Sequence, residues 1–164
     1  MIELREIGLD SGRDGLEILQ KLANDSEIFD GSPVPKEIDS HLYLGFLVIA
    51  EEEREYCHRY WVTYRGDIIG YSDIRLNPEY AEVGLALDKD FRDQGLGLVT
   101  LRTLIDKAKN EFDKKTVVVS VDPKNEKMIK LCEKVGGELG NTDSKSHYFL
   151  WLLIITCLFV EYFI

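Results

Sequence analysis

The chain has 164 residues and carries a formal net charge of −10. This length is typical of one domain with its own hydrophobic core. The acidic surplus argues against general nucleic-acid binding, which requires basic surface patches. It is compatible with a cationic partner such as an amine, although acidity also serves solubility alone.

The three cysteines, Cys57, Cys132 and Cys157, lie far apart and show none of the spacings of a metal site. Their odd number favours reduced thiols. The first residues lack the basic and apolar run of a secretory signal. We therefore expect a cytoplasmic protein that uses no metal.

The N-terminal region predicts a strand and then a helix. Residues 2–7 alternate between apolar and polar side chains, as a half-buried strand does. Ser11 and Asp14 have the spacing of a capping box, which would open the helix. The residues expected on the inward face of this helix are Leu16, Leu19, Leu22 and Ala23.

A loop at residues 31–35 precedes a second predicted helix, which runs from residue 36 to about residue 53. The apolar spacing of this helix predicts one buried face. The residues expected on that face are Ile38, Leu42, Gly45, Phe46 and Ile49. Residues 60–64 and 68–76 then predict a β-hairpin around Arg65-Gly66-Asp67.

A strand, a glycine-bearing turn and a helix follow one another in residues 81–112. The strand at residues 83–87 leads to Arg92-Asp93-Gln94-Gly95-Leu96-Gly97, where the helix begins. The first amides of a helix lack intrahelical partners, and the helix dipole adds positive charge at the same end. Because Gly95 and Gly97 have no side chains, the turn is a candidate phosphate or pyrophosphate site. Flexible glycines in an ordinary connection are the alternative, and neither the P-loop nor the dinucleotide-binding spacing is present.

A second strand–helix unit follows the first. Residues 115–122 are rich in β-branched side chains and predict a buried strand. Asn125 stands where a helix N-cap is expected, and the helix should span residues 126–135. Gly136-Gly137 marks its end.

Both units resemble motifs of the GNAT superfamily of acyl-CoA-dependent N-acetyltransferases. The turn matches the Arg/Gln-x-x-Gly-x-Gly/Ala pattern of the central motif, and Asn125…Met128…Glu133-Lys134-Val135-Gly136 is similar to the other common motif. Two positions differ. Gly137 replaces the usual Phe, and Cys132 replaces a Tyr that protonates the CoA thiolate in many relatives.

The resemblance covers roughly residues 1–153 and implies an α/β (α+β) fold. Helices would flank a central, mixed, mostly antiparallel sheet in the order β-α-α-β-β-β-α-β-α-β. The last strand would lie near residues 147–153, inside an apolar segment that spans residues 148–164. The remaining residues, 154–164, are too few to span a bilayer. They are interpreted as an extra strand, a homodimer interface or a non-native tail, with a membrane anchor as the less favoured alternative.

The resemblance also implies an activity, which is acetyl transfer from acetyl-CoA to a primary amine by direct attack in a ternary complex. The acceptor would be a small molecule, a peptide or a protein N-terminus. In the family, backbone amides hold the pantetheine arm and the pyrophosphate. The matching residues here are Leu85, Ala86 and Leu87 for the arm, Arg92, Asp93, Gln94, Gly95, Leu96, Gly97 and Leu98 for the pyrophosphate, and Asn125 from the second motif.

Two carboxylates are candidates for the chemistry. Glu82 stands where many relatives carry a Glu-Ile-Gly sequence, and strand alternation places it opposite Val83 and Leu85. A carboxylate there would accept the amine proton directly or through water, whereas the alternative is a Glu that only solubilises the sheet. Asp73, on a neighbouring strand, would bind the ammonium, or it would simply face solvent.

Cys132 follows the apolar spacing of its helix, so we expect a packed core thiol and not a nucleophile. The missing Tyr and Phe leave a second function class open, a non-catalytic CoA-binding or interaction module of the same fold. A membrane-attached form of either is the third alternative.

Overall fold

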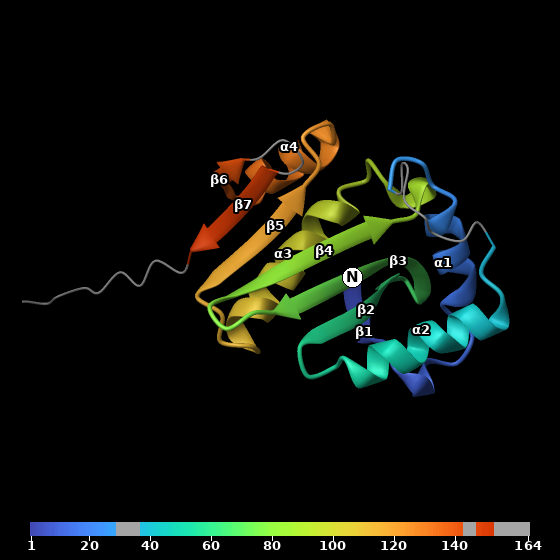
Figure 1. The fold of residues 1–164 in the computed structure, drawn as a ribbon. Helices are drawn as coiled ribbons and strands as arrows, with labels where there is room; N and C mark the ends of the chain where they lie inside the picture. The colour runs from blue at the N-terminus through green and yellow to red at the C-terminus, as the bar shows by residue number, and fades with distance from the viewer. Residues whose placement is uncertain (29–36, 143–146, 153–164) are drawn as a thin grey trace, which may run out of the picture.

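The computed structural model describes residues 1–28, 37–142 and 147–152. Its centre is a seven-stranded sheet with the order β1-β2-β3-β4-β5-β7-β6 (Figure 1). The strands are β1 (Ile2–Glu6), β2 (Cys57–Tyr64), β3 (Asp67–Leu76), β4 (Tyr80–Leu87), β5 (Thr116–Val121), β6 (Glu138–Thr142) and β7 (His147–Leu152). Neighbouring strands are antiparallel except β4 and β5, which are parallel. The predicted mixed, mostly antiparallel sheet is therefore confirmed.

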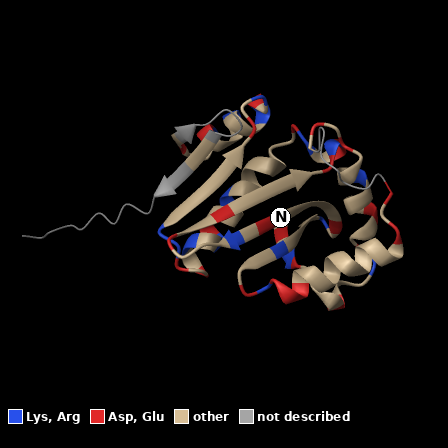
Figure 2. Cartoon of the chain, viewed as in Figure 1, with Lys and Arg blue, Asp and Glu red and all other residues tan. Residues whose placement is uncertain are grey.

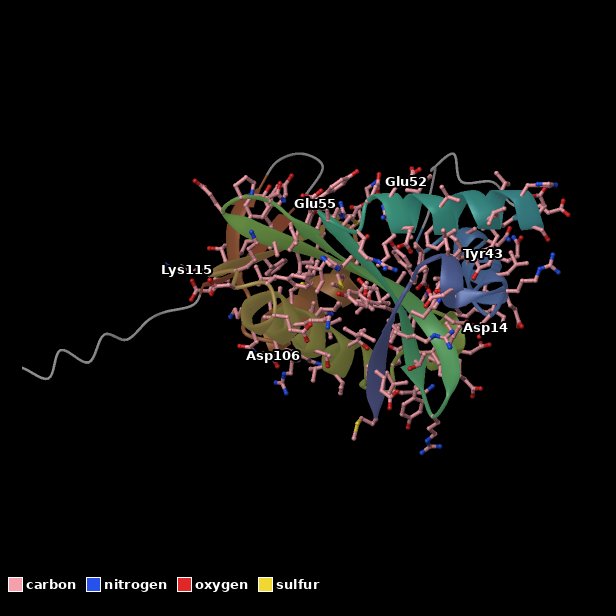
Figure 3. The ribbon with its side chains drawn as sticks, turned by 90° about the horizontal axis from the view of Figure 1, so that it is seen from below. Asp14, Tyr43, Glu52, Glu55, Asp106 and Lys115 are labelled. Atoms are coloured by element: carbon pink, nitrogen blue, oxygen red, sulfur yellow. The ribbon has the colours of Figure 1, made fainter. Side chains whose placement is uncertain are left out.

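Helices lie on both faces of this sheet. Those in the described residues are α1 (Leu16–Ala23), α2 (Ser40–Glu52), α3 (Leu96–Asn110) and α4 (Glu126–Lys134), with short 3-10 helices at Leu9–Ser11 and Lys89–Phe91. Figure 3 shows α2 on one side of the sheet and α3 on the other. The helices therefore bury both faces of the sheet, with α1 and α2 on one face and α3 and α4 on the other.

The apolar residues divide between these two faces. α3 and α4 pack on one face of the sheet, where Leu101, Leu104, Val117 and Val119 are fully or almost fully buried. α1 and α2 pack on the other face around Trp61, which is completely buried. Because α1 and α2 cover only part of their face, β4 and β5 stay uncovered on that side (Figure 1).

The buried face of α2 differs from the prediction. The structure buries Tyr43, Leu47 and Ala50, whereas Leu42 and Ile49, predicted to face the core, are 49% and 47% exposed. Of the other predicted residues, Ile38 and Phe46 are partly buried against this core, as expected, and Gly45 is exposed. Apolar residues surround this helix on nearly every side, so its periodicity does not single out one face. Tertiary contacts decide instead: the hydroxyl of Tyr43 accepts a hydrogen bond from the Gly15 amide at 3.2 Å.

The predicted capping box at Ser11 and Asp14 is wrong. Ser11 ends a 3-10 helix, its Oγ accepts from the Gly8 amide at 3.0 Å, and α1 begins only after Gly15. Of the predicted inward residues Leu22 is buried, Leu16 and Leu19 are partly buried, and the fully buried residue that the prediction omitted is Ile18. The glycines between Ser11 and Leu16 disfavour an earlier helix start.

The hairpin is confirmed with longer strands, because Tyr64 pairs with Asp67 and leaves Arg65-Gly66 as a two-residue turn. β6 was not predicted; it pairs with β7 at the end of the sheet. Two predictions, the loop at residues 31–35 and the apolar extension at residues 154–164, lie outside the described residues.

Candidate active site

β4 and β5 run side by side only at their beginnings. Their parallel pairing joins Tyr80 to Thr116, Ala81 to Val117 and Glu82 to Val118. Within the described chain the strands then continue to Leu87 and Val121 without pairing with each other. Backbone groups on the facing edges past Glu82 therefore lack a strand partner and can bind a ligand placed between the strands.

The turn after β4 brings a helix N-terminus to this opening. Gly95 is the N-cap of α3 and has a left-handed conformation with φ of 78°, which glycine adopts without steric cost. The amides of the first turn, at Leu96, Gly97 and Leu98, have no carbonyl partner inside α3. The positive end of the helix dipole is added at the same place.

A cleft of about 470 Å³ lies at this point. It is formed by the end of β4, the turn, α4 and the segment that follows α1. The lining residues are Glu27, Ile28, Leu85, Ala86, Leu87, Arg92, Asp93, Gly95, Gly97, Leu98, Asn125, Lys127, Met128, Lys130, Leu131 and Lys134.

The predicted cofactor residues line this cleft with two exceptions, Gln94 and Leu96. Gln94 Nε2 donates to the Asp90 carbonyl at 2.8 Å, and the side chain of Leu96 is buried in the core. The cleft thus collects the residues that the two motifs singled out, from elements about 30 residues apart in sequence. Their roles toward a cofactor stay predictions.

The sequence interpretation missed two groups of cleft residues. Glu27 and Ile28 come from the segment after α1, and no local pattern marks them. Lys127, Lys130 and Lys134 come from α4, and their i, i+3, i+7 spacing on one helix face was a readable signal for a basic stripe. This stripe supplies positive charge in a chain whose net charge is −10.

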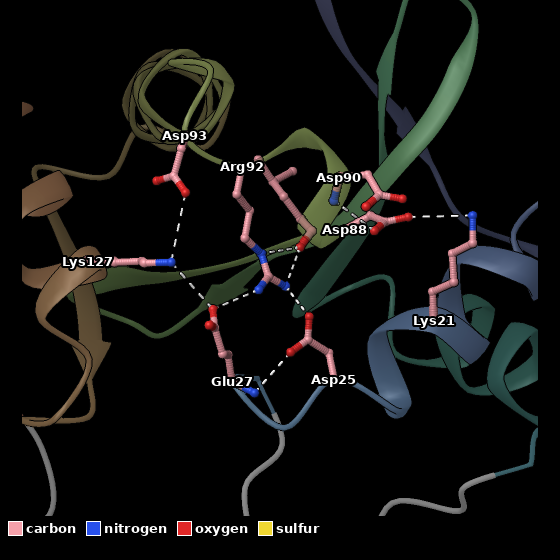
Figure 4. Close-up of polar contacts among 9 residues, drawn as sticks. Lys21, Asp25, Glu27, Asp88, Asp90, Arg92, Asp93 and Lys127 are labelled. Carbon is pink, nitrogen blue, oxygen red and sulfur yellow. Dashed lines mark hydrogen bonds and ion pairs between the residues drawn. The ribbon is translucent and has the colours of Figure 1, made fainter.

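The guanidinium of Arg92 is held by the protein itself (Figure 4). Its Nε and Nη2 donate to the Leu87 carbonyl at 2.9 and 2.7 Å. Its Nη2 also contacts Asp25 at 2.5 Å, and its Nη1 contacts Glu27 at 3.0 Å. Arg92 therefore joins the end of β4 to the segment after α1. A phosphate bound near Arg92 would have to share its guanidinium with two carboxylates.

α4 begins at the predicted cap. The side-chain oxygen of Asn125 accepts from the Met128 amide at 3.0 Å. On the cleft side of α4, Lys127 Nζ lies 3.7 Å from Glu27 and 3.9 Å from Asp93. Lys127 thus reaches the turn before α3, and the N-terminal ends of both helices meet at the cleft.

Glu82 sits at the point where β4 and β5 separate, since it forms their last parallel pair. Its side chain is 26% exposed, and its Oε2 lies 3.8 Å from Arg75 Nη1. Arg75 Nη2 lies 3.4 Å from Asp73 Oδ1. Burial opposes the charge of Arg75, but the two carboxylates outweigh burial and raise its pKa above the ordinary value. Figure 2 shows acidic and basic positions side by side on β2, β3 and β4.

Asp73 is the more buried of the two predicted carboxylates, with 13% of its side chain exposed. The hydroxyl of Tyr71 donates to its Oδ2 at 3.1 Å. Burial, followed by the charge of Asp73, raises the pKa of Tyr71 far above its ordinary value, so this phenol stays protonated. The structure therefore brings Asp73 of β3 and Glu82 of β4 to one patch, with Arg75 between them.

Cys132 is completely buried on the core side of α4 and does not line the cleft. Burial raises the pKa of its thiol to about 12. The expectation of a packed core thiol is confirmed, and a buried neutral thiol is poorly suited to proton donation in the cleft.

The described residues contain no group of three or more His, Cys, Asp or Glu side chains arranged to hold a metal ion. Each helix among them is also too short or too polar to cross a membrane.

A comparison with models of protein families identifies the family to which this chain belongs. Residues 19–137 match the model of the acetyltransferase (GNAT) family. The chain belongs to this family. The match includes the segment after α1, the end of β4, the turn before α3, and α4, which together form the cleft. No curated protein matches the chain significantly.

Solved structures of several acetyltransferases are similar to the fold of this chain. An aminoglycoside acetyltransferase in complex with coenzyme A and kanamycin has a TM-score of 0.75 and 18% identity, over 93% of this chain and 95% of that one. The N-acetyltransferase PseH of Campylobacter jejuni, in complex with acetyl coenzyme A, has a TM-score of 0.70 and 18% identity, over 93% and 99%. The spermidine N-acetyltransferase of Vibrio cholerae, in complex with CoA and spermine, has a TM-score of 0.74 and 15% identity, over 93% and 95%.

Proposed function

We propose that this GNAT protein is an N-acetyltransferase that moves an acetyl group from acetyl-CoA to a primary amine. The observation that carries the proposal is the separation of β4 and β5 past Glu82, beside a cleft that ends at an uncapped helix N-terminus. The turn amides would hold the pyrophosphate, and the edge of β4 at Leu85–Leu87 would hold the pantetheine arm. This geometry would direct the thioester toward Glu82.

In the proposed reaction the amine nitrogen attacks the thioester carbonyl carbon, and the carbon–sulfur bond breaks. Glu82 takes the proton that the amine loses, directly or through one water. The departing thiolate takes a proton from solvent, because Cys132 is buried away from the cleft. Holding both reactants in line supplies much of the rate enhancement in such a ternary complex.

The charges around Asp73 and Glu82 support a cationic acceptor. These two carboxylates carry two negative charges against the one positive charge of Arg75, which leaves one net negative charge in this group. The Arg75 contacts are long and its side chain is 49% exposed, so they are weak and a substrate ammonium can replace them. Two structural neighbours were solved with cationic compounds, kanamycin and spermine.

A non-catalytic CoA-binding module is the second candidate. It is favoured by one observation, the burial of Cys132 where many relatives carry the acidic Tyr. Both candidates require acetyl-CoA binding, and only the first requires turnover.

The test has two parts. Isothermal calorimetry with acetyl-CoA should show binding, and its absence would defeat both candidates. Release of free CoA thiol should then be followed with a panel of polyamines, aminoglycosides, amino acids and peptides. Amine-dependent thiol release supports the enzyme, whereas binding without release on any acceptor supports the module.

A further inference from the structure

Glu27 places a carboxylate between two cations of the cleft (Figure 4). Its Oε2 lies 3.0 Å from Arg92 Nη1, on the turn before α3, and 3.7 Å from Lys127 Nζ, on α4. One carboxylate oxygen therefore bridges the two elements whose N-terminal ends meet there. A phosphate oxygen bound at this turn would seek the same two partners.

At this corner of the cleft the carboxylates of the protein already outnumber its cations. Arg92 and Lys127 contribute two positive charges, and Asp25, Glu27 and Asp93 contribute three negative charges, which leaves one net negative charge. A pyrophosphate would add further negative charge at short range, and like charges at such distances repel. Binding is therefore favoured if one carboxylate moves away.

The contacts indicate which carboxylate moves. The side chain of Asp25 is 13% exposed, its Oδ2 lies 2.5 Å from Arg92, and its Oδ1 accepts from the Glu27 amide at 2.9 Å. The side chain of Glu27 is 62% exposed, and among the described residues its contacts are two ion pairs, with Arg92 and Lys127. Exposed ion pairs contribute little, so Glu27 is released easily while Asp25 stays. The side chain of Asp93 is 80% exposed, and its one ion pair within the described part of the chain is 3.9 Å long, so it already faces solvent.

We propose that Glu27 is an exchangeable anion that competes with the pyrophosphate of acetyl-CoA for Arg92 and Lys127. This inference rests on the proposed function, because it takes acetyl-CoA as the ligand of the cleft. Glu27 thereby limits the affinity of the site and couples cofactor binding to the segment that follows α1.

The test is the affinity of the whole protein for acetyl-CoA in Glu27→Gln. Gln keeps the length of the side chain and removes the charge, so the dissociation constant should fall by roughly 1.5- to 5-fold, the range expected from one exposed ion pair. The gain should shrink at high salt, which screens the competition. Glu17→Gln is the matched control, because Glu17 is an exposed ion-pair partner on α1 that does not line the cleft.

Two further probes separate the outcomes. Inorganic pyrophosphate should compete better against acetyl-CoA in Glu27→Gln than in the wild type, whereas S-acetylpantetheine, which lacks phosphates, should bind both equally. Affinity in Glu27→Gln equal to or weaker than that in Glu17→Gln would overturn the inference and leave the proposed function intact. If the wild type binds no acetyl-CoA, the proposed function itself fails, and the inference falls with it.

Discussion

Gly84 of β4 lies directly opposite Asp73 of β3, and a Cβ atom at Gly84 would stand 2.6 Å from Asp73 Oδ1. The missing side chain therefore makes room for the carboxylate. Asp73 also accepts a hydrogen bond from Tyr71 at 3.1 Å, so its position is set from two sides. This pair links a glycine of β4 to the proposed acceptor site.

Gly84→Ala should displace the Asp73 carboxylate and weaken its contact with an acceptor ammonium. With roughly 1 kcal/mol of interaction lost, kcat/KM for the amine should fall about fivefold, while the acetyl-CoA dissociation constant stays unchanged. Steady-state kinetics and calorimetry measure the two effects. Gly45→Ala is the control, since a Cβ there meets nothing within 4 Å. Unchanged amine kinetics in Gly84→Ala would remove Asp73 from the acceptor site.

Glu82→Gln should lower turnover by roughly 10²–10⁴ if Glu82 is the base, because the amide keeps the shape but takes no proton. Acetyl-CoA affinity should change little, because Glu82 does not line the cleft. The thiol-release assay measures turnover, and the exposed Glu79→Gln in the turn before β4 is the matched control. Turnover within a few-fold of the wild type would make Glu82 structural.

Gly95→Val should abolish acetyl-CoA binding. Gly95 has φ of 78°, where a β-branched residue is strained, and the new side chain would be added at a residue that lines the cleft. The strain should also cost on the order of 1–2 kcal/mol of stability. Calorimetry at a temperature where the variant is folded separates the two effects, and an unchanged dissociation constant there would refute the phosphate role of the turn.

Cys132→Ala should lower the free energy of unfolding by on the order of 1 kcal/mol and keep most activity, because the thiol is a small buried core group. Cys132→Tyr should be less stable, by roughly 1–3 kcal/mol, through overpacking. Urea unfolding measures both variants. Lost turnover in a folded Cys132→Ala protein that still binds acetyl-CoA would contradict the core assignment and reopen a thiol mechanism.

The same thiol offers a chemical check. With a pKa raised to about 12, Cys132 stays protonated at neutral pH. It should therefore react with iodoacetamide in the folded protein far more slowly than in urea, as mass spectrometry of the modified peptide would show. Equal rates in the two states would contradict its burial.

Glu53 and Arg59 give a pH-dependent prediction. The hydrogen bond from Arg59 lowers the pKa of Glu53 below its ordinary value of 4.5. The pair therefore stabilises the fold fully above pH 4.5, and this contribution is lost as the pH falls through the lower folded-state pKa.

The melting temperature of Glu53→Gln should thus lie below that of the wild type at neutral pH, and the gap should close in acid. Thermal unfolding between neutral pH and pH near 3 tests this. Glu52→Gln, on the exposed side of α2, should show no such gap (Figure 3). A gap that persists or widens in acid would show that the effect does not come from the ionised pair.

Local physics was enough for the features that depend on neighbours in sequence. The Gly95 turn, the Asn125 cap and the β-branched strand before it are written in short patterns, because backbone sterics and helix-end hydrogen bonds act over a few residues. The same holds for the hairpin at Arg65-Gly66, where both turn residues have positive φ. These patterns predicted the residues of one wall of the cleft. They also carried the resemblance to the family.

Tertiary structure alone decided the rest. α2 is apolar on most sides, and the buried side is the one whose Tyr43, Leu47 and Ala50 pack around Trp61, where Tyr43 also contacts Gly15. The packing of distant segments brought Glu27 to Arg92, 65 residues away, and no local pattern encodes such a meeting. Arg92 shows how far the sequence alone reaches. Its position in the motif was predicted, but its carboxylate partners are set by the packing of the segment after α1. Side-chain partners across the sheet depend on packing free energy summed over the whole chain, whereas turns and caps depend on the few residues that form them.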